Sequence, residues 1–529
     1  MVAGNVFQLI LNDGSLDTLL YGSRVLHQKL SKYVRTRMNT CIKQARIWLD
    51  DPSNLMDPSY EDRKALFLSD PDEYCYTYYA DKIQPSLVDI SKSHGVYINS
   101  CYKPFVKVAY TYIKSKDSQG LASFGNEIKF DIPLIGNWTS DMVLHMKLDD
   151  FAAKSPLDKV KYADFLGHRL IDQVIFYANW KEVARYSREA YNKHYYMDVP
   201  LDKRAGYLRS IGQEEIHKGF LTQVPANDEH REIKYFSDGP QTYKNVQDPV
   251  DIWLPLLFWF NKDIARAFPN GKADYLTLQV GIKLNTMESC VNVLDGGGGG
   301  EFTPPSIATM DVWSNQVATT PEIAKTIFAS NYDHNLIRVT KEFSHTINAP
   351  HGDIKFQSIK YPIENYAISL RPLENENNID IWHRNTKLIR KNIEVPVVAD
   401  PITNTLGINN AYYFKSFNTI RECGLKVYDV DIYPSIPVKF FDSYIPYSSK
   451  GYVTPELPGW ILFNFQQRHD LYDPSGWLNG TRSKKGIYFN YISDVVDNDN
   501  RANIYVVADC INFLSFDKNS NSIILRYGP

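Results

Sequence analysis

The chain has 529 residues, of which 43% are apolar and 22% charged, and its formal net charge is -3. A chain of this length exceeds one hydrophobic core and predicts at least two domains. Its small net charge excludes a bulk attraction to nucleic acid or anionic lipid, so we expect no direct binding of nucleic acid. The aromatic content, with 36 Tyr and 26 Phe, favours β structure.

The sequence predicts neither a secretory leader nor a membrane span. The N-terminus, "MVAGNVFQLILNDGS", lacks the basic start and the cleavage site of a signal peptide. The strongest apolar run, "DIWLPLLFWF", is shorter than the roughly 20 residues that cross a bilayer. The cysteines are far apart in sequence and form no CxxC motif, so we expect reduced, structural thiols. They are Cys41, Cys75, Cys101, Cys290, Cys423 and Cys510.

Residues 16 to 49 predict a helix, because apolar side chains recur there at spacings of three and four. Basic residues with no acid between them lie along the same segment: Arg24, Lys29, Lys32, Arg35, Arg37, Lys43 and Arg46. One interpretation is a solvated helix face, partly offset by the acidic residues that follow. The other is an electrostatic contact with a membrane surface or an inner shell protein.

From about Cys101 the apolar period changes to two. In "YLTLQVGIKL" the side chains of Leu276, Leu278, Val280 and Ile282 fall on one face, and "YAISLRP" from Tyr366 repeats the alternation. Many short runs of this kind, separated by Gly, Pro, Asn and Asp, are typical of β-sandwiches or barrels. Aromatic runs such as "DIWLPLLFWF" and "GWILFNF" are interpreted as core strands.

Two features punctuate the β pattern. Gly296–Gly300 predicts a flexible, exposed loop tip that tolerates deletion, because "EFTPPS" follows where a phosphate-binding loop needs a helix. Further on, "TTPEIAKTIF" predicts a short helix with Thr320 as its cap and Pro321 at its first position. We place the break between two β units there, which gives an extension over 1–95 and β units over 96–315 and 320–529.

Catalytic and metal-binding motifs are not found. The sequence contains no GxSxG, HExxH or P-loop motif. His334, His345 and His351 are eleven and six residues apart, which matches neither one helix face nor a metal-ligand pattern. We therefore expect no enzymatic activity, no cofactor and no metal.

A dense loop signal lies near the C-terminus, in "LYDPSGWLNGTRSKKGIYFNY" from Leu471. Pro474 fixes φ, Gly476 permits a tight turn, and Asn479 and Thr481 can bond nearby backbone. Arg482 can tie the loop to a neighbouring carbonyl or carboxylate. Together with Ser475 these residues predict a structural motif at the entry to a late strand; a bound ligand is the alternative.

The stretch "DPSGWLNGTR" resembles a motif near the end of the major capsid proteins of nucleocytoplasmic large DNA viruses. In that family a Pro-Ser-Gly turn precedes Asn, a hydroxyl residue, Arg and a strand; Thr481 stands where Ser is more usual. Other segments are similar to the asfarvirus branch, in the same order along nearly the whole chain. They include "CYKPFVKVAY", "GYLRSIGQE", "IKYPIENYAISLRP", "SYIP" and "ILRYGP". This chain is shorter than its asfarvirus counterpart, so we expect trimmed loops.

The resemblance implies a mainly β protein with two tandem jelly-roll β-sandwiches, a double jelly roll, after a partly helical N-terminal extension. It implies a homotrimeric, pseudo-hexameric capsomer that tiles an icosahedral shell. The further partners implied are minor capsid and penton proteins, with an inner membrane or inner shell protein at the basic helix. The location implied is the virion capsid, assembled in the host cytoplasm.

Two alternatives remain open at this point. The first is a double jelly-roll scaffold that is discarded from immature virions, as in poxviruses. The second is a carbohydrate-active enzyme on a β-sandwich, which needs paired carboxylates about 5–9.5 Å apart in a cleft. The presence of the chain in mature particles separates the scaffold from the permanent shell, and a structure addresses the enzyme.

Overall fold

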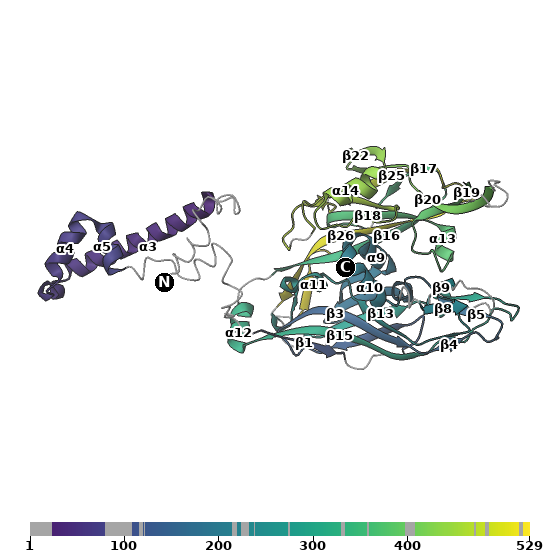
Figure 1. Ribbon diagram of the computed structural model, residues 1–529, viewed down its shortest axis with the longest axis horizontal. Helices are drawn as coiled ribbons and strands as arrows, with labels where there is room; N and C mark the ends of the chain where they lie inside the picture. Colours follow the sequence, from purple (N-terminus) through teal and green to yellow (C-terminus); the bar gives the residue numbers. More distant parts are fainter. Residues whose placement is uncertain are drawn as a thin grey trace. The chain divides into compact units, whose positions relative to one another are not determined.

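A computed structural model gives the fold of the chain, which divides into two compact units, Met1–Phe105 and Val106–Pro529. The units are described separately (Figure 1). The structure describes residues 24–79, 108–115, 120, 122–213, 219–223, 232–236, 239–272, 276–329, 334–356, 359–396, 408–469, 472–481, 486–517 and 522–528.

The N-terminal unit is helical, with α3 (Arg24–Asp50), η1 (Pro52–Met56), α4 (Tyr60–Ser69) and α5 (Pro71–Tyr78). Met38, Cys41 and Ala45 on α3 pack with Tyr74 and Cys75 on α5 in a small core. This spacing of three and four is the one that predicted the helix. Within the described residues the helix begins at Arg24, and residues 16–23 lie outside them.

The first part of the larger unit is a jelly roll with eight main strands in two sheets. One sheet has the order β1-β15-β3-β11 and the other the order β2-β13-β6-β7, and every pairing is antiparallel. The first sheet contains β1 (Val108–Lys114), β15 (Ile307–Thr319), β3 (Trp138–Leu148) and β11 (Val250–Pro255), with β12 (Phe268–Pro269) beside β3. The second contains β2 (Glu127–Ile132), β13 (Leu278–Leu284), β6 (Ile171–Ala178) and β7 (Lys181–Ser187).

The second part repeats this topology strand for strand. Its sheets have the orders β16-β26-β18-β23 and β17-β25-β21-β22. In both halves the first main strand pairs with the eighth and the second with the seventh, which is the jelly-roll pattern. The strands are β16 (His334–Ile347), β17 (His351–Lys355), β18 (Pro362–Pro372), β21 (Glu422–Val427), β22 (Val430–Pro437), β23 (Trp460–Asn464), β25 (Ile487–Ile492) and β26 (Ala502–Asp517), with β24 (Leu478–Asn479) and β27 (Ser522–Leu525) at the ends of the first sheet. Two tandem jelly rolls confirm the predicted fold class.

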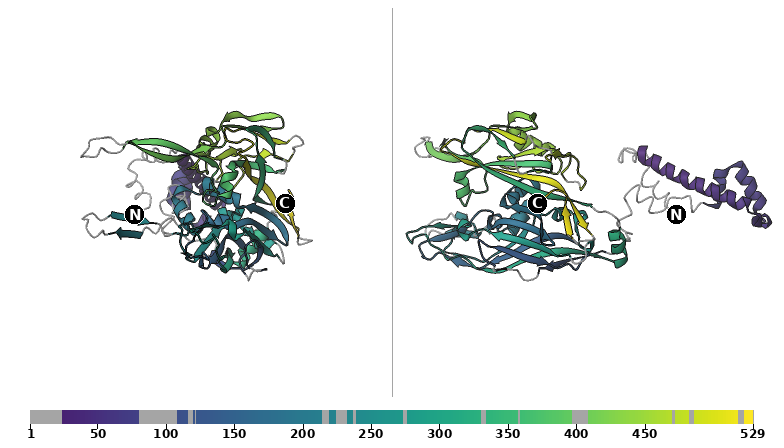
Figure 2. Two further views of the ribbon diagram at one scale, coloured as in Figure 1. Left: turned by 90° about the vertical axis from the view of Figure 1, so that its right-hand side faces the viewer. Right: turned by 180° about the vertical axis from the view of Figure 1, so that it is seen from behind.

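The four sheets are stacked as layers (Figures 1 and 2). The sheet β2-β13-β6-β7 of the first jelly roll faces the sheet β16-β26-β18-β23 of the second, and the other two sheets lie on opposite outer sides. The predicted inward faces are buried, as Leu278, Val280 and Ile282 show. Strand β18 is buried along its whole length, including Ser369 and Arg371, which alternate with its apolar side chains. The reason is that the second jelly roll packs against the first on that side.

Further elements connect or extend the sandwiches. Helix α12 (Pro321–Ala329) joins the two jelly rolls, as predicted, and the amide of Ala324 donates to the carbonyl of Thr320. Two hairpins extend from the bodies (Figure 2): β8 (Gly219–Gln223) with β9 (Glu232–Phe236), and β19 (Thr386–Pro396) with β20 (Ile408–Asn418). Short ladders pair β4 (Phe151–Ala152) with β10 (Val246–Gln247), and β5 (Lys159–Tyr162) with β14 (Val291–Leu294).

Two further features of the described residues concern the cysteines and the character of the helices. Cys41, Cys75, Cys290, Cys423 and Cys510 are buried free thiols, whereas Cys101 lies outside the described residues. Among the helices that the structure describes, none is long and apolar enough to cross a membrane.

Candidate functional site

The candidate site is the seam between the two jelly rolls, and one helix forms its centre. Helix α9 (Arg188–Lys193) follows β7 and continues into a π-helical turn, η2 (His194–Asp198). Ser187 caps the helix, because its hydroxyl accepts from the amide of Glu189 at 3.2 Å. Helix α9 lies between the jelly rolls (Figure 1), and its residues from Glu189 to Lys193 are buried. Its side chains therefore meet the second jelly roll without intervening solvent.

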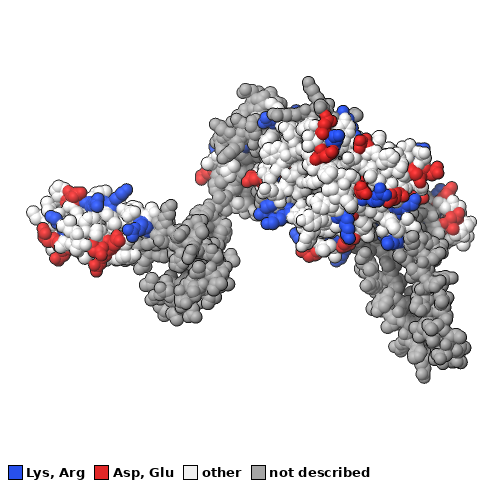
Figure 3. Space-filling model, turned by 90° about the horizontal axis from the view of Figure 1, so that it is seen from above, with Lys and Arg blue, Asp and Glu red and all other residues white. Residues whose placement is uncertain are grey.

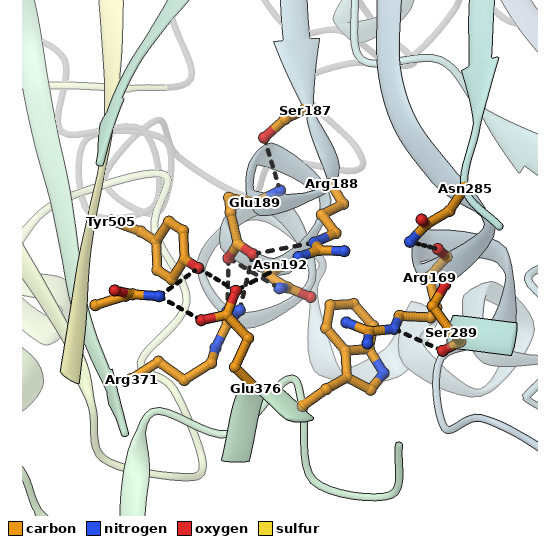
Figure 4. A network of polar contacts seen from close by, with 12 residues as sticks. Arg169, Ser187, Arg188, Glu189, Asn192, Asn285, Ser289, Arg371, Glu376 and Tyr505 are labelled. Carbon is orange, nitrogen blue, oxygen red and sulfur yellow. Dashed lines mark hydrogen bonds and ion pairs between the residues drawn. The ribbon is translucent and has the colours of Figure 1, made fainter. Parts of the chain in front are cut away.

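The strongest cross-seam contact is a two-pronged ion pair between Glu189 on α9 and Arg371 on β18 (Figure 4). The two guanidinium Nη atoms donate to the two carboxylate oxygens at 2.8 and 2.6 Å. Asn192 donates to the same carboxylate at 3.1 Å. Burial raises the pKa of Glu189, but the Arg371 guanidinium outweighs it and holds that pKa below its usual value. The carboxylate is therefore ionised inside the seam.

A second buried pair lies at the other end of α9. Lys193 donates to Asp509 on β26, and Asn365 on β18 donates to the same carboxylate at 2.9 Å. Burial raises the pKa of Asp509, yet the Lys193 ammonium holds it far below its usual value. The seam thus carries two charge pairs in which one partner belongs to each jelly roll.

Glu342 on β16 completes the contact at the start of α9. Its two carboxylate oxygens accept from the backbone amide of Ser187 at 3.1 and 2.9 Å. Burial raises the pKa of Glu342 to about 7, although the hydrogen bonds from Ser187 oppose the shift. A residue of the second jelly roll therefore satisfies a backbone donor at the beginning of a helix that belongs to the first.

Neutral and peripheral contacts extend the seam. The indole of Trp382 donates to the carbonyl of Asp164 at 2.7 Å, and Lys181 donates to the carbonyl of Ile523 at 3.1 Å. Glu376, next to β18, accepts from Tyr505 and lies 3.5 Å from Arg188 (Figure 4). The Trp382, Lys181 and Arg188 contacts join the two halves, so they hold the jelly rolls in one relative orientation.

The π-helical turn ends at a cavity of about 960 Å³ beside the seam. Asp198 lies 3.3 Å from His194, 3.6 Å from His469 and 3.9 Å from Lys262. Burial raises the pKa of Asp198, but Lys193 and Lys262 hold it well below its usual value. Within the described residues, no three Cys, His, Asp or Glu side chains gather where they could hold a metal ion.

The loop motif near the C-terminus lies at the edge of the second jelly roll. Ser475 both accepts from the amide of Arg468 at 3.0 Å and donates to its carbonyl at 2.9 Å. Asn479, in β24, accepts from the amide and the hydroxyl of Thr481 at 3.0 and 2.7 Å. Strand β24 pairs with the start of β18. Pro474 is half-buried in this loop, and Arg482 lies outside the described residues.

Gly476 has a specific reason to be glycine. Its φ is +154°, and a Cβ there would meet the carbonyl oxygen of Phe465 at 2.4 Å. Any larger residue would push the loop away from the end of β23. The loop therefore packs closely on the strand that precedes it.

The basic helix residues lie on α3 in the N-terminal unit. Arg35, Lys43 and Arg46 are exposed and Arg37 is half-buried. For the remaining three, Arg24, Lys29 and Lys32, the structure places the backbone in α3 and describes no side chain. They belong to the N-terminal unit, whereas the seam lies within the larger unit.

The glycine run is exposed, as predicted, but it is not a free tip. Amides of Gly296, Gly298 and Gly300 donate to the carboxylate of the buried Asp158 at 2.9–3.0 Å. Those of Gly297, Gly298 and Gly299 donate to Asp295 at 2.7–3.2 Å. The sequence did not predict these two carboxylate partners of the run, and its tolerance of deletion stays a prediction.

Comparisons with known proteins agree with this architecture. The chain is similar to the major capsid protein of Faustovirus, with a TM-score of 0.68 and 20% sequence identity over 88% of this chain and 100% of that one. It is also similar to Vp54 of PBCV-1, with a TM-score of 0.58 and 16% identity over 81% and 99% of the two chains. The fold is thus that of the double jelly-roll major capsid proteins of large DNA viruses.

The sequence comparison extends along the whole chain. The chain is 23% identical to hexon protein p72 of African swine fever virus over 686 aligned positions that cover 100% of both proteins. The same identity and coverage are found for the major capsid protein of a second isolate of this virus. No protein-family profile matches the chain. The resemblance drawn from the loop motif is confirmed, since the curated relatives are asfarvirus capsid proteins.

Proposed function

We propose that this chain is the main structural subunit of the icosahedral shell of a large DNA virus, and that three copies form a capsomer of pseudo-hexagonal outline. The observation that carries the proposal is the repeat of one jelly-roll topology twice in a chain, joined by a buried seam. A rigid pair of similar wedges, used three times around one axis, gives six similar wedges in a closed ring.

We assign the jelly rolls to about residues 96–315 and 320–529, with the N-terminal extension over 1–95. Strand pairing supports two separate units, since each described ladder joins strands of one jelly roll only, but the last strand of the first, β15, continues past the proposed boundary to Thr319. Helix α12 and its flanking residues then form the connection. The loop motif has a structural role in this proposal, because its hydrogen bonds join it to β18 and to the chain after β23.

Mass measurement tests the trimer. Light scattering at micromolar and nanomolar concentration should give the mass of three chains at both, because permanent interfaces typically bury about 2,000 Å² or more. Ring-shaped particles should appear in negative stain. A stable monomer at both concentrations would overturn the proposal. Detection of the chain in mature particles favours a permanent shell, and its loss on maturation favours the scaffold.

The basic surface of α3 is proposed to bind an anionic inner surface, either a membrane or an inner shell protein. Each basic residue near anionic lipid contributes about 1 kcal/mol, so reversing three of them should abolish most binding. Arg35→Glu, Arg37→Glu and Lys43→Glu combined should weaken binding to acidic vesicles. The matched control reverses the exposed Lys159, Lys360 and Lys450 of the larger unit. Equal binding by both variants would show that the basic residues of α3 form an ordinary solvated helix face.

Further partners and the location follow from the same proposal. Minor capsid and penton proteins would contact the outer parts of the capsomer, and assembly would take place in the host cytoplasm before the chain becomes part of the virion capsid. Figure 3 shows acidic and basic groups interspersed over the outer side of the second jelly roll. Such a mixed surface suits polar, reversible contacts between capsomers. Capture of these proteins with the trimer in infected-cell extracts tests this part.

A further inference from the structure

The second jelly roll carries a counterpart of α9 at the same place in its topology. In the first jelly roll α9 and η2 stand between the fifth and sixth main strands, β7 and β11. In the second, the π-helical turn η7 (Phe440–Tyr444) and helix α14 (Ile445–Ser448) stand between the fifth and sixth main strands, β22 and β23. Both insertions include a π-helical turn, so the two segments are topologically equivalent.

The two equivalent segments have opposite surroundings. Helix α9 is buried in the seam, whereas α14 lies on the outer side of the second jelly roll, away from the first (Figure 1). Tyr444 and Tyr447 are 55% and 80% exposed there. Exposed aromatic side chains on a segment whose counterpart is an interface helix point to a contact that a single chain does not make.

The surface that receives α9 has a counterpart as well. Helix α9 packs on the face of the sheet β16-β26-β18-β23 that carries Glu342, Arg371 and Asp509. The equivalent sheet of the first jelly roll is β1-β15-β3-β11, and in one chain nothing within the described residues covers its outer face.

This outer face carries exposed aromatic side chains beside paired charges such as Lys114 with Asp311, whereas the outer face of a sandwich is usually polar throughout. Tyr110 and Tyr112 on β1 are 59% and 52% exposed, and Trp253 on β11 is 38% exposed. Trp253 stacks on His145 with ring centroids 4.1 Å apart and lies 6.3 Å from Trp313. These side chains span the sheet from one edge strand to the other.

From this we infer that η7–α14 of one copy docks on the outer face of β1-β15-β3-β11 of the next copy, as α9 docks within the chain. The inference rests on the proposed function and names the partner surface of the capsomer. Each chain then contributes η7–α14 to one neighbour and its outer sheet face to the other. The contact is therefore head-to-tail and can close a ring. Tyr and Trp are the residues most often found at the energetic centre of interfaces.

Two sets of substitutions test the inference from its two sides. The helix variant is Tyr444→Ser with Tyr447→Ser, and the face variant is Tyr110→Ser with Trp253→Ser. Each should lose the trimer and run at the mass of one chain, while its circular dichroism stays that of the wild type. The control is Trp180→Ser, which removes an aromatic side chain that is 70% exposed in the turn between β6 and β7. The control should remain trimeric.

Mixing the two variants distinguishes a head-to-tail contact from other contacts between copies. The helix variant keeps an intact face and the face variant keeps an intact helix, so an equimolar mixture should form a dimer of one chain each and no ring. Trimers in both variants, with a trimeric wild type, would overturn this inference and leave the proposed function in place. A monomeric wild type would instead overturn the proposed function. If one variant misfolds, trimers in the other alone overturn the inference.

Discussion

The two equivalent helices solve the same packing problem with different chemistry. Helix α9 is held by buried charges, Glu189 with Arg371 and Lys193 with Asp509. Its counterpart η7–α14 presents Tyr444 and Tyr447 to solvent. A seam within one chain forms once, during folding, and each charge always has its partner. A contact between chains is absent in the free subunit, which must still be stable. A charge that loses its partner inside the protein would destabilise that subunit, whereas an exposed tyrosine is tolerated.

The largest expected effect comes from removing one charge of the seam. Arg371→Ala leaves Glu189 buried without its partner, and this should lower the free energy of unfolding by about 3–5 kcal/mol. Chemical denaturation followed by tryptophan fluorescence measures the loss. The double variant Glu189→Gln with Arg371→Met should recover most of it, because no lone charge remains. A loss below about 1 kcal/mol in the single variant would contradict a charge-held seam.

A buried carboxyl group of the seam, that of Glu342, should make stability depend on pH. Folding raises the pKa of Glu342 from 4.5 to about 7. Its contribution to stability is therefore fully present below about pH 4.5 and lost as the pH rises through about 7. The expected loss is about 1–3 kcal/mol, measured as free energy of unfolding at a series of pH values. Glu342→Gln should flatten this part of the profile, and an unchanged profile would exclude Glu342 as its source.

A neutral contact at the edge of the second jelly roll should contribute less to stability than the Arg371 ion pair or Glu342. Ser475→Ala removes two hydrogen bonds to Arg468, both on exposed groups. The free energy of unfolding should fall by about 1 kcal/mol. Ser475→Thr, which keeps the hydroxyl, is the matched control. Equal losses in both variants would show that shape and not hydrogen bonding sets the loop.

The smallest effect is expected at the exposed helix. Adding Tyr444→Ser and Tyr447→Ser to the monomeric face variant should change its free energy of unfolding by less than about 0.5 kcal/mol. The reason is that both rings are largely exposed in one chain. Thermal unfolding of the two monomers measures the difference. A loss of about 2 kcal/mol or more would mean that these side chains stabilise the chain itself.

The sequence predicted the sandwiches and the break between them from local patterns. Period-two runs identified strands such as β13, and Thr320 with Pro321 placed α12. It did not predict the seam, because Glu189 and Arg371 are 182 positions apart. For the same reason it did not predict that both faces of β18 are buried. The carboxylate partner of the glycine run was not predicted either, because Asp158 lies 138 positions from Gly296.

The sequence analysis also did not identify exposed aromatic residues inside apolar runs. "DIWLPLLFWF" was interpreted as a core strand, and Ile252 and Leu254 are indeed buried. Trp253 between them points outward, as the alternation of a strand requires. The period-two pattern therefore held a signal for the aromatic outer face. A role of this face in assembly could be inferred only from the fold, because the fold shows that the equivalent face of the second jelly roll is covered within the chain.

A density map of the assembled capsomer would show which surfaces of neighbouring copies meet. We expect η7–α14 of each copy to lie against the outer face of β1-β15-β3-β11 of its neighbour, with Tyr447 covered and three such contacts alternating with the three internal seams. A map in which η7–α14 faces solvent or the threefold axis, with the Tyr110 and Trp253 face packed on another surface, would contradict it.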